Sequence, residues 1–498
     1  MIKFNLGLAL LLWTVLAFGQ NQDDRLYNLE AEIDSIMQTY HTAGMSIAIV
    51  ENDEVIYSQG LGFRNLSQKL PVNANTLFPI GSVSKPLTAS LIGVYQASER
   101  LNLNDKPQKH IKSLRFYSDE MNHLITIADL LSHRSGIGVV DGTHVFFPTN
   151  DLDLHLQRLV HLKPNSSVRE RFDYSNMGYA ILGGITEKIS GKSWAENLKA
   201  EIFEPLEMYR SNTNLKDLQA DENYALGYSI ANDEIVKVEY EDQHESVASG
   251  AVNSTATELA NWVRMLLNRG KYNEQQILAE AYLARSFSEQ NIIRGSFSFD
   301  QKNDLLADTY GYGWFVNQYQ GLYRVHHEGN VSGFTASVNL YPYKNIGIII
   351  LANQGGANSL TKAINEIILK RLLRIERKKW QDYPIQIGEA RMVNDTLKPI
   401  NEEKRPTHPL SAYCGKYKSE GYGVVEVLFE SGNLNIQFPA FKMGLEHQHY
   451  NTFINKVITV THQNTPSFYI NFPPNNEGNI SELTIGFSAE GERFEKIE

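Results

Sequence analysis

The sequence predicts an α+β domain followed by a small all-β domain. Strand patterns lie at both ends of residues 20–375 with helical patterns between them, so the sheet of this domain must be assembled from distant parts of the chain. From residue 409 onwards, only short strand patterns separated by turn signals occur. These patterns predict an all-β domain over residues 407–498.

The first domain is expected to begin with a helix and a β-hairpin. Residues 28–42 carry apolar side chains on one side at helical spacing, which predicts an amphipathic helix. Apolar runs at 46–50 and 55–57 flank a polar turn at 51–53. Two such runs around a short turn are typical of a hairpin.

The middle of the domain is predicted to be helical, apart from one irregular segment. Residues 139–172 are rich in His, Pro, Asn and Asp, and they predict either a loop over a site or a surface excursion. Strand patterns return after residue 323 with a second hairpin at 335–351, and a helix from about Ser359 closes the domain. The other predicted helices cover 82–100, the stretch starting at 125–133, 178–190 and about 257–268.

A charged segment separates the two domains. Residues 376–406 lack a sustained period and are predicted to be a linker. Beyond it, strand patterns occur at 413–417, 424–429 and 434–438. We find no catalytic constellation in this C-terminal part of the sequence.

Composition and the first residues predict an exported protein without a nucleic-acid partner. The 498-residue chain has a formal net charge of −11 and no basic cluster, which argues against nucleic-acid binding. Residues 1–19 resemble a signal peptide, with Lys3, an apolar stretch and small residues before the cleavage site. The stretch is short for a retained membrane anchor, which needs about 20 apolar residues. The mature protein is therefore expected to be periplasmic or secreted, without a membrane span.

Cysteine and histidine usage gives no reason to expect a metal or another cofactor. Cys414 is the only cysteine, which excludes an intramolecular disulfide and a thiol metal site. The sequence contains no His-Glu-x-x-His motif. His447 and His449 are spaced for one face of a strand, but such a pair is more often surface chemistry than a metal site.

The candidate catalytic residues begin with Ser82 and Lys85. The apolar residues that follow place Ser82 at or near a helix start, where side chains three apart are neighbours. A serine hydroxyl and a lysine amine in that relation can form a nucleophile and its base. The free N–H groups at a helix start also favour a developing oxyanion. A second match, Ser359 and Lys362, is interpreted as the capped start of an amphipathic helix.

Further motifs follow Ser82 and Lys85 in a fixed order. The tripeptide Tyr174-Ser175-Asn176 precedes a helical pattern, and a His-Glu-Gly tripeptide starts at His327 on a strand. Residues 131–136, Leu-Ser-His-Arg-Ser-Gly, are similar to a Leu-x-x-His-x-Ser-Gly segment. With these motifs, residues 27–375 resemble the serine β-lactamase and penicillin-binding-protein family, especially its class C-like esterase and peptidase branch.

This resemblance implies a fold and a set of roles. The fold would be β-lactamase/transpeptidase-like, with a mixed antiparallel sheet, flanking helices and a helical subdomain, and the C-terminal part resembles a small β domain often appended to such hydrolases. Tyr174 would face the Ser–Lys pair and pass a proton to the leaving group. Asn176 would hold Lys85 and a substrate amide. The backbone N–H groups of Ser82 and Asn330 would form the oxyanion hole.

The proposed base needs a perturbed pKa. A lysine amine titrates near 10.4, so a downward shift of about 3 units, roughly 4 kcal/mol, is needed to make Lys85 half neutral near physiological pH. Burial and a nearby positive group are the usual means.

The third motif departs from the β-lactamase pattern. Typical β-lactamases carry Lys-Thr-Gly on this strand, whereas His327, Glu328 and Gly329 occupy the positions here. The resemblance implies that His327 and Gly329 bind substrate, and a glycine suits a strand that a substrate approaches closely. Histidine is mostly neutral at pH 7, and Glu328 would repel a carboxylate if it pointed into the site. These features argue against β-lactamase activity as the main function.

The sequence thus predicts an exported serine hydrolase that cleaves an ester or amide through an acyl-enzyme on Ser82. Its substrate would be a small molecule or a peptide- or glycan-linked acyl group. β-Lactamase, D-Ala-D-Ala carboxypeptidase and D-aminopeptidase activities stay open, as does the oligomeric state. A non-catalytic sensor of penicillin or peptidoglycan is a further alternative, although a binder has no need of Ser82, Lys85 and Tyr174 together. A third hypothesis is a carbohydrate-binding protein, in which the C-terminal domain would bind the sugar and the catalytic site would be vestigial.

Overall fold

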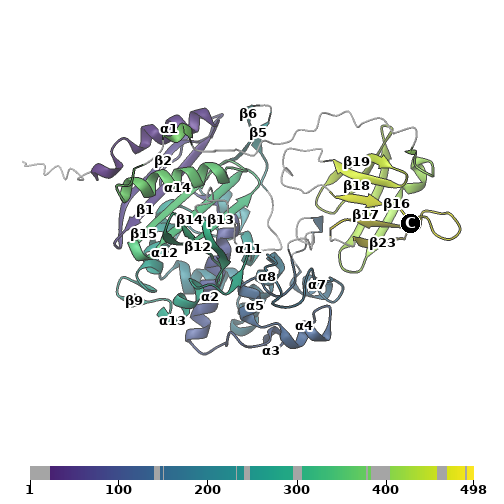
Figure 1. The fold of residues 1–498 in the computed structure, drawn as a ribbon, viewed down its shortest axis with the longest axis horizontal. Helices are drawn as coiled ribbons and strands as arrows, with labels where there is room; N and C mark the ends of the chain where they lie inside the picture. The colour runs from purple at the N-terminus through teal and green to yellow at the C-terminus, as the bar shows by residue number, and fades with distance from the viewer. Residues whose placement is uncertain are drawn as a thin grey trace, which may run out of the picture.

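The fold is known from a computed structural model (Figure 1). The predicted signal peptide, residues 1–19, lies outside the described residues, as does most of the predicted linker, 376–406. None of the described helices combines the length and the apolar character that crossing a membrane requires. The structure describes residues 23–138, 146–147, 149, 151–231, 233–240, 247–294, 305–376, 379–382, 404–456, 468–487 and 491–497.

Within these residues, the first domain is organised around a nine-stranded antiparallel sheet of order β10-β11-β12-β13-β14-β15-β1-β2-β3. The N-terminal hairpin meets the late strands where β1 pairs with β15, with Ile47 opposite Ile350. The sheet is therefore assembled from distant parts of the chain, as predicted. Its strands are β1 (Gly44–Glu51), β2 (Glu54–Asn65), β3 (Leu70–Pro71), β10 (Asn291–Ile292), β11 (Leu305–Tyr310), β12 (Phe315–Tyr319), β13 (Leu322–Val331), β14 (Phe334–Tyr341) and β15 (Ile346–Ala352). Short pairs join β4 (Phe78–Pro79) to β7 (Asn253–Ser254), β5 (Gly227–Ala231) to β6 (Glu234–Val238), and β8 (Lys271–Tyr272) to β9 (Gln275–Gln276).

The helices start and end close to the predicted positions. Ser82 lies in a single 3₁₀ turn, η2 (Gly81–Val83), and the α-helix itself begins at Ser84. A short helix that the sequence pattern did not reveal lies within the irregular segment 139–172, where the Asp151 side chain caps α7. The α-helices in the part of the chain that the structure describes are α1 (Leu29–Thr39), α2 (Ser84–Ala97), α3 (Pro107–His110), α4 (Asp119–Leu124), α5 (Ile127–Leu131), α7 (Leu152–Arg158), α8 (Asn176–Ser190), α9 (Trp194–Leu198), α10 (Leu215–Ala220), α11 (Val247–Gly250), α12 (Ala256–Leu267), α13 (Glu280–Ser286) and α14 (Asn358–Leu372).

Helices cover both faces of the sheet. Side chains alternate along a strand, so Ile47 and Ile49 of β1 enter the apolar cluster formed with α1 and α14. Ala48 and Val50 enter the larger cluster on the other face, which contains the buried faces of α2 and α12. Figure 1 shows α1 and α14 together on one side of the sheet. Burial on both faces explains why β1 is an almost continuous apolar run.

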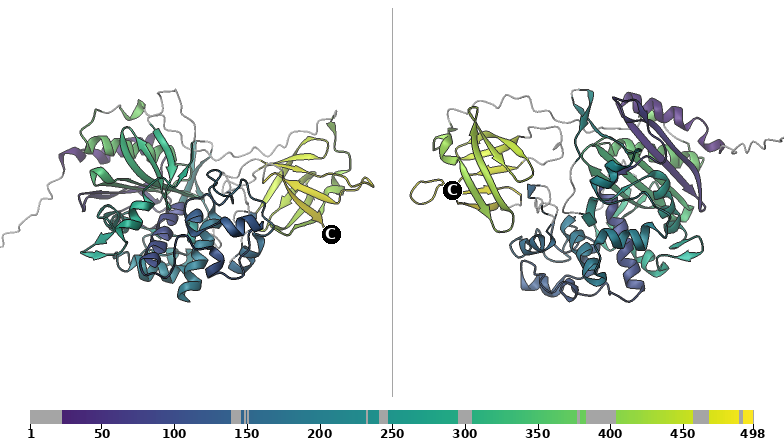
Figure 2. Two further views of the ribbon diagram at one scale, coloured as in Figure 1. Left: turned by 60° about the horizontal axis from the view of Figure 1, so that its bottom comes forward. Right: turned by 180° about the vertical axis from the view of Figure 1, so that it is seen from behind.

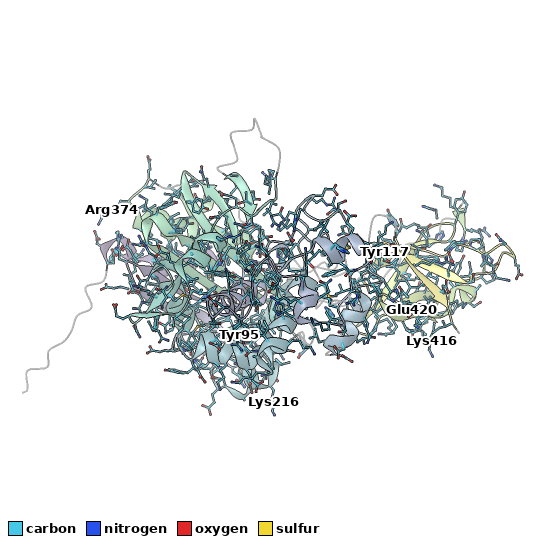
Figure 3. The ribbon with its side chains drawn as sticks, turned by 90° about the horizontal axis from the view of Figure 1, so that it is seen from below. Tyr95, Tyr117, Lys216, Arg374, Lys416 and Glu420 are labelled. Atoms are coloured by element: carbon cyan, nitrogen blue, oxygen red, sulfur yellow. The ribbon has the colours of Figure 1, made fainter. Side chains whose placement is uncertain are left out.

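The C-terminal domain is a closed β-barrel, which confirms the predicted small all-β domain. Its strands follow one another around the barrel in chain order, and β16 closes it by pairing with β23. Both views in Figure 2 show the barrel beside the blue helical part of the first domain, and Figure 3 shows Lys416 and Glu420 on the barrel. The strands in the described residues are β16 (Gly415–Ser419), β17 (Gly423–Glu430), β18 (Asn433–Gln437), β19 (Lys442–His449), β20 (Thr452–Lys456), β21 (Tyr469–Asn471), β22 (Glu482–Ile485) and β23 (Glu492–Lys496).

Candidate active site

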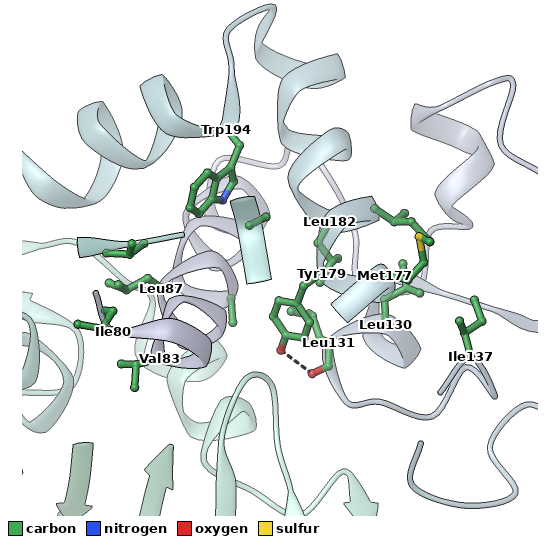
Figure 4. Packing of buried hydrophobic residues seen from close by; sticks show 14 of the residues in the cluster. Ile80, Val83, Leu87, Leu130, Leu131, Ile137, Met177, Tyr179, Leu182 and Trp194 are labelled. Carbon is green, nitrogen blue, oxygen red and sulfur yellow. Dashed lines mark hydrogen bonds between the residues drawn. The ribbon is translucent and has the colours of Figure 1, made fainter. Parts of the chain in front are cut away.

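Ser82 lies at the start of α2, in a turn that the core holds in place. The backbone N–H of Ile80 donates to the carbonyl oxygen of Val252 over 3.0 Å, and Val83 is fully buried. Gly81 has a φ of +51°, a conformation that suits glycine and turns the chain sharply into the helix. Figure 4 shows Ile80 and Val83 packed at this end of the helix. The Ser82 side chain remains partly exposed.

Lys85 is buried in the first turn of α2. Its Nζ lies 3.2 Å from Oγ of Ser82, 2.7 Å from Oδ1 of Asn176 and 3.0 Å from the carbonyl oxygen of Ser249. Burial lowers the pKa of the Lys85 amine well below its ordinary value of 10.5. Burial in the fold is thus a physical cause for the lowered pKa that a lysine needs in order to act as a base.

Tyr174 and Asn176 approach the Ser–Lys pair from the start of α8. The hydroxyl of Ser175 caps this helix by accepting a hydrogen bond from a backbone N–H of its first turn. The ring of Tyr174 lies under the amine of Lys85, with 4.6 Å from Nζ to the ring centroid. Burial raises the pKa of the Tyr174 hydroxyl, and a hydrogen bond with Ser82 acts in the opposite direction. The phenol is therefore protonated at neutral pH.

The strand β13 passes directly beside the turn that carries Ser82. Its pairing with β12 ends at His326, and beyond this point it lies against the turn. A Cβ atom on Gly329 would stand 1.9 Å from a carbonyl oxygen of the turn and 2.9 Å from the backbone N of Ser82. A Cβ atom on Gly81 would likewise stand 2.9 Å from the backbone N of Asn330. Glycine on both sides thus permits the contact between the two segments predicted to form the oxyanion hole.

His327 lies behind this contact, with 1% of its surface exposed. Its Nδ1 is 2.6 Å from the carbonyl oxygen of Glu328, and its Nε2 is 3.1 Å from the hydroxyl of Tyr310. A carbonyl only accepts, so Nδ1 carries the proton and Nε2 accepts from the phenol. Burial, reinforced by the charge of Lys85, lowers the pKa of His327 to about 3. The ring is therefore neutral, and its contact with substrate remains a prediction.

Glu328 points away from the site. Its carboxylate accepts a hydrogen bond from Nδ2 of Asn358 over 2.9 Å and lies 3.5 Å from Nζ of Lys362. Both partners belong to α14, on the face of the sheet opposite to α2. Repulsion of a substrate carboxylate by Glu328 therefore does not arise. Ser359 and Lys362 lie in the first turns of α14, which confirms the predicted helix start. The predicted cap is wrong, because the N-cap residue is Ala357, whose side chain forms no capping hydrogen bond.

His133 is a site residue to which sequence reasoning gave no role. Its Nδ1 accepts a hydrogen bond from the backbone N–H of Ser175 over 3.0 Å, and its ring centroid lies 4.4 Å from that of Tyr174. Burial lowers the pKa of His133 well below its ordinary value, so the ring is a neutral support for Tyr174. The similarity of residues 131–136 to a family segment was the only available signal. Tyr310 and the Ser249 carbonyl had no signal in the sequence.

The predicted residues thus come together at one place. The arrangement holds a serine hydroxyl, a buried amine, a protonated phenol and the backbone N–H groups of two facing segments. Such groups suit attack on a carbonyl followed by proton transfer to the leaving group. Among the described residues, no group of three or more His, Cys, Asp or Glu side chains could hold a metal ion.

The fold and the order of the motifs define a protein of the β-lactamase/transpeptidase-like class. Comparison with family models agrees, since the model described as Beta-lactamase matches residues 29–372. The chain belongs to this family, which confirms the resemblance seen in the sequence. A second model, described as a domain of unknown function, DUF3471, matches residues 400–496 and covers the barrel.

The curated relatives have low sequence identity to this chain but align with most of its length. The chain is 27% identical over 335 residues to Protein flp of Staphylococcus aureus (strain COL), an alignment covering 66% of this chain and 64% of that protein. It is 25% identical over 451 residues to the unguisins hydrolase ungD of Aspergillus violaceofuscus, covering 82% of this chain and 77% of the relative. The chain therefore spans 64% of the length of this flp protein, just under two thirds.

Solved structures share the fold along nearly the whole chain. The octameric penicillin-binding protein homologue from Pyrococcus abyssi superposes with a TM-score of 0.61 at 23% identity, covering 94% of this chain and 99% of that one. SurE superposes with a TM-score of 0.57 at 17% identity, covering 95% and 99%. At these identities the likeness concerns the fold alone.

Proposed function

We propose that this chain is an exported serine hydrolase that cleaves an ester or an amide through an acyl-enzyme on Ser82. The observation that carries the proposal is the environment of the Lys85 amine. A neutral amine has two N–H donors and one lone pair. The Asn176 side chain and the Ser249 carbonyl accept the two donors, so the lone pair is directed at Oγ of Ser82 over 3.2 Å. Lys85 is thus placed to act as the base.

The proposed reaction has two halves. Oγ of Ser82 attacks the substrate carbonyl carbon while its proton moves to Nζ of Lys85. The backbone N–H groups of Ser82 and Asn330 stabilise the oxyanion, and removing one such donor in other enzymes costs about 10²–10³ in rate. The bond to the leaving group then breaks, and the Tyr174 hydroxyl gives the leaving atom its proton and takes one back from Lys85. Water hydrolyses the resulting ester, which releases the acid and restores Ser82.

The neutral His327 favours ester or amide substrates over β-lactams. Typical β-lactamases place a lysine at this position, where it helps hold a carboxylate. His327 has a pKa lowered to about 3, so it brings no positive charge at neutral pH. β-Lactam hydrolysis, D-Ala-D-Ala cleavage and simple ligand capture are therefore treated as outcomes of the test rather than as the proposal. The unguisin hydrolysis recorded in the name of one relative makes an unguisin a suitable member of the substrate screen.

The test is intact-protein mass spectrometry after incubation with a fluorophosphonate. Wild type is compared with Ser82→Ala and with Ser359→Ala, which alters the other Ser-x-x-Lys match at the start of α14. A single adduct that disappears only in Ser82→Ala supports an activated serine and justifies a screen of esters, D-amino-acid amides, an unguisin and penicillins. A folded wild type that takes up no adduct contradicts the proposal and favours a non-catalytic binder.

Export is proposed from the first nineteen residues. Lys3, the apolar stretch and the small residues before Gln20 support a cleaved signal peptide. Mass spectrometry of the mature protein from a periplasmic or culture-medium fraction tests this. An N-terminus at Gln20 in that fraction supports export, and an intact N-terminus in the cytoplasmic fraction contradicts it.

A further inference from the structure

Two phenylalanines from the catalytic domain close one end of the C-terminal barrel. Phe146 and Phe147 are 3% and 1% exposed. Consecutive strands run up and down around the barrel, so alternate turns lie at the same end. Most rings that contact the pair come from the four turns of one end, namely Tyr422 before β17, Phe438 and Phe441 between β18 and β19, Phe468 before β21 and Phe487 after β22. Phe494, near the start of β23, adds a further ring, which stacks on Phe147 with 6.0 Å between the centroids.

The contact is a packed aromatic cluster with backbone hydrogen bonds. The ring centroid of Phe146 lies 4.8 Å from that of Phe438, with the two rings tilted by 55°, and aromatic pairs at such distances are favourable beyond their burial. The carbonyl oxygen of Phe146 accepts from the backbone N–H of Ala440 over 3.4 Å. The carbonyl oxygen of Phe147 accepts from the buried guanidinium of Arg158 over 2.6 Å. An eight-stranded barrel has room inside for side chains or one small ligand, and here the phenylalanine pair caps that interior.

The chain segment that follows this pair lies between the barrel and α8. We call residues 151–164 the arm. Near its start, Leu152 reaches within 2.8 Å of where a Cβ on Gly184 of α8 would stand. Near its end, Leu162 lies 3.2 Å from where a Cβ on Gly421, in the β16–β17 turn, would stand. The arm is thus held on one side by the catalytic domain and on the other by the barrel.

After the arm, the chain leads directly back to the catalytic residues. The backbone N–H of Asn165 donates to the carbonyl oxygen of Gly136 over 2.8 Å, and that of Asp173 donates to the carbonyl oxygen of His133 over 2.9 Å. These bonds join the outgoing chain before the arm, at residues 133–136, to the returning chain after it, at residues 165–173. We call these two joined segments the base of the arm. Tyr174 is the next residue after this base. Barrel and active site are therefore connected by one continuous stretch of packed chain.

The base of the arm is held by ion pairs of its own, which do not involve the barrel. The fully buried carboxylate of Asp129 accepts from Nε of Arg134 over 2.6 Å and from Nη2 of Arg169 over 2.8 Å. These bonds hold the outgoing and returning chains regardless of where the arm lies. Loss of the barrel contact should therefore leave Tyr174 and the Ser–Lys pair in place while loosening the arm, which then keeps only its contacts with the catalytic domain.

We propose that Phe146 and Phe147 are positioning residues, through which the barrel anchors the arm that leads back to Tyr174 and thereby sets the affinity for bulky substrates. This inference rests on the proposed function of Ser82 for its catalytic consequence. Its structural consequence, the anchoring of the arm, is independent of any activity. The barrel thereby acts on substrate binding, whereas the chemistry at Ser82 stays with α2, α8 and β13.

The test compares the full-length Phe146→Ala/Phe147→Ala variant with Leu154→Ala. Leu154 lies in the same arm, but its side chain is 40% exposed and makes a matched control. Hydrogen exchange is followed in residues 151–164 and in 165–175. We expect exchange in the arm to rise at least tenfold in the double variant, with the base and the control unchanged, because apolar anchoring of the arm is lost.

Kinetics supply the second readout. In the double alanine variant, we expect the rates of fluorophosphonate labelling and of p-nitrophenyl acetate hydrolysis to stay within about twofold of wild type. KM for the p-nitrophenyl ester of a blocked dipeptide should rise about tenfold, because the variant loses binding that is equal in the ground state and the transition state. The Phe146→Leu/Phe147→Leu variant keeps an apolar side chain at both positions and should bring KM back toward the wild-type value. Unchanged hydrolysis of the small ester by the double alanine variant excludes general misfolding as the cause.

Two results would overturn the inference. One is unchanged exchange in the arm of the double variant, which would show that the barrel does not anchor it. The other is an equal loss of activity toward the small and the bulky ester, which would show a general defect of the catalytic domain. If wild type takes up no fluorophosphonate, the proposed function fails, and the exchange data still decide whether the anchor exists.

Discussion

Replacing Gly329 with alanine should separate the two halves of the proposed oxyanion hole. The added Cβ would stand 1.9 Å from the carbonyl oxygen of Ile80 and 2.9 Å from the backbone N of Ser82. Ordinary contact begins at 3.4 Å, so β13 and the turn would have to move apart by about 1.5 Å. Both clashing atoms are backbone, so neither can rotate away as a side chain would. The strand and the nucleophile therefore cannot keep their present distance.

The size of the effect follows from this displacement. Loss of one oxyanion-hole donor costs about 10²–10³ in rate, which corresponds to about 2.7–4 kcal/mol of transition-state stabilisation. A misplacement of about 1 Å is already enough to cost about 10²-fold. We therefore expect kcat/KM of Gly329→Ala to fall by about 10²–10³. The free energy of unfolding should fall by roughly 1–3 kcal/mol, as for other overpacked sites.

The assay is ester hydrolysis together with the second-order rate of fluorophosphonate labelling, measured beside thermal unfolding. Gly178→Ala is the matched control, because Gly178 also lies next to the site, in α8, and its added Cβ would meet its nearest neighbour at an ordinary 3.6 Å. The control should keep its activity. A Gly329→Ala variant that retains activity within about threefold of wild type, well above the loss expected for a missing donor, would refute the assignment of the oxyanion hole to this contact.

Three further predictions concern the proton carriers and the charge beside the site. Burial lowers the pKa of Lys85 and its neutral form is the base, so the acylation rate should rise with pH and level off well below pH 10.5. Lys85→Met should lose both the acylation rate and this pH dependence. A wild-type rate that still rises at pH 10.5 would contradict the lowered pKa. Tyr174→Phe should slow amide cleavage by about 10²–10⁴ and slow cleavage of an activated p-nitrophenyl ester far less, because that leaving group needs no proton. Equal losses on the two substrates would exclude proton delivery by Tyr174. Glu328→Gln should change activity less than twofold and the free energy of unfolding by at most about 1 kcal/mol, since Glu328 faces α14; a tenfold loss of activity would show that its charge reaches the site.

The sequence was informative where chemistry depends on local spacing. Ser82 and Lys85 are three residues apart, so a helical turn brings them together whatever the rest of the chain does. Tyr174 and Asn176 flank a capping serine, which fixes their positions at a helix start. The distant strand of Gly329 was placed only through the ordered resemblance. Its contact with Ser82 then explains the glycine.

Other features depended on packing that spacing does not specify. Alternation along β13 could have shown that Glu328 and His327 face opposite sides of the sheet, because successive strand residues do. The complete burial of His327 by Tyr310 could not be predicted, since these residues meet only through sheet pairing. The Ser249 carbonyl is a backbone group, which residue type does not reveal. Two adjacent phenylalanines in a polar segment were the only hint of the barrel contact.

Trapping the acyl-enzyme itself tests the central claim most directly. Wild type and Lys85→Met would be mixed with p-nitrophenyl acetate, quenched in acid within the burst phase, and digested for peptide mapping by mass spectrometry. An acetyl group on Ser82 in wild type, and its absence in Lys85→Met, is the predicted result. An acetyl group on another residue, or equal acetylation of Ser82 in both proteins, would contradict a Ser82 nucleophile activated by Lys85.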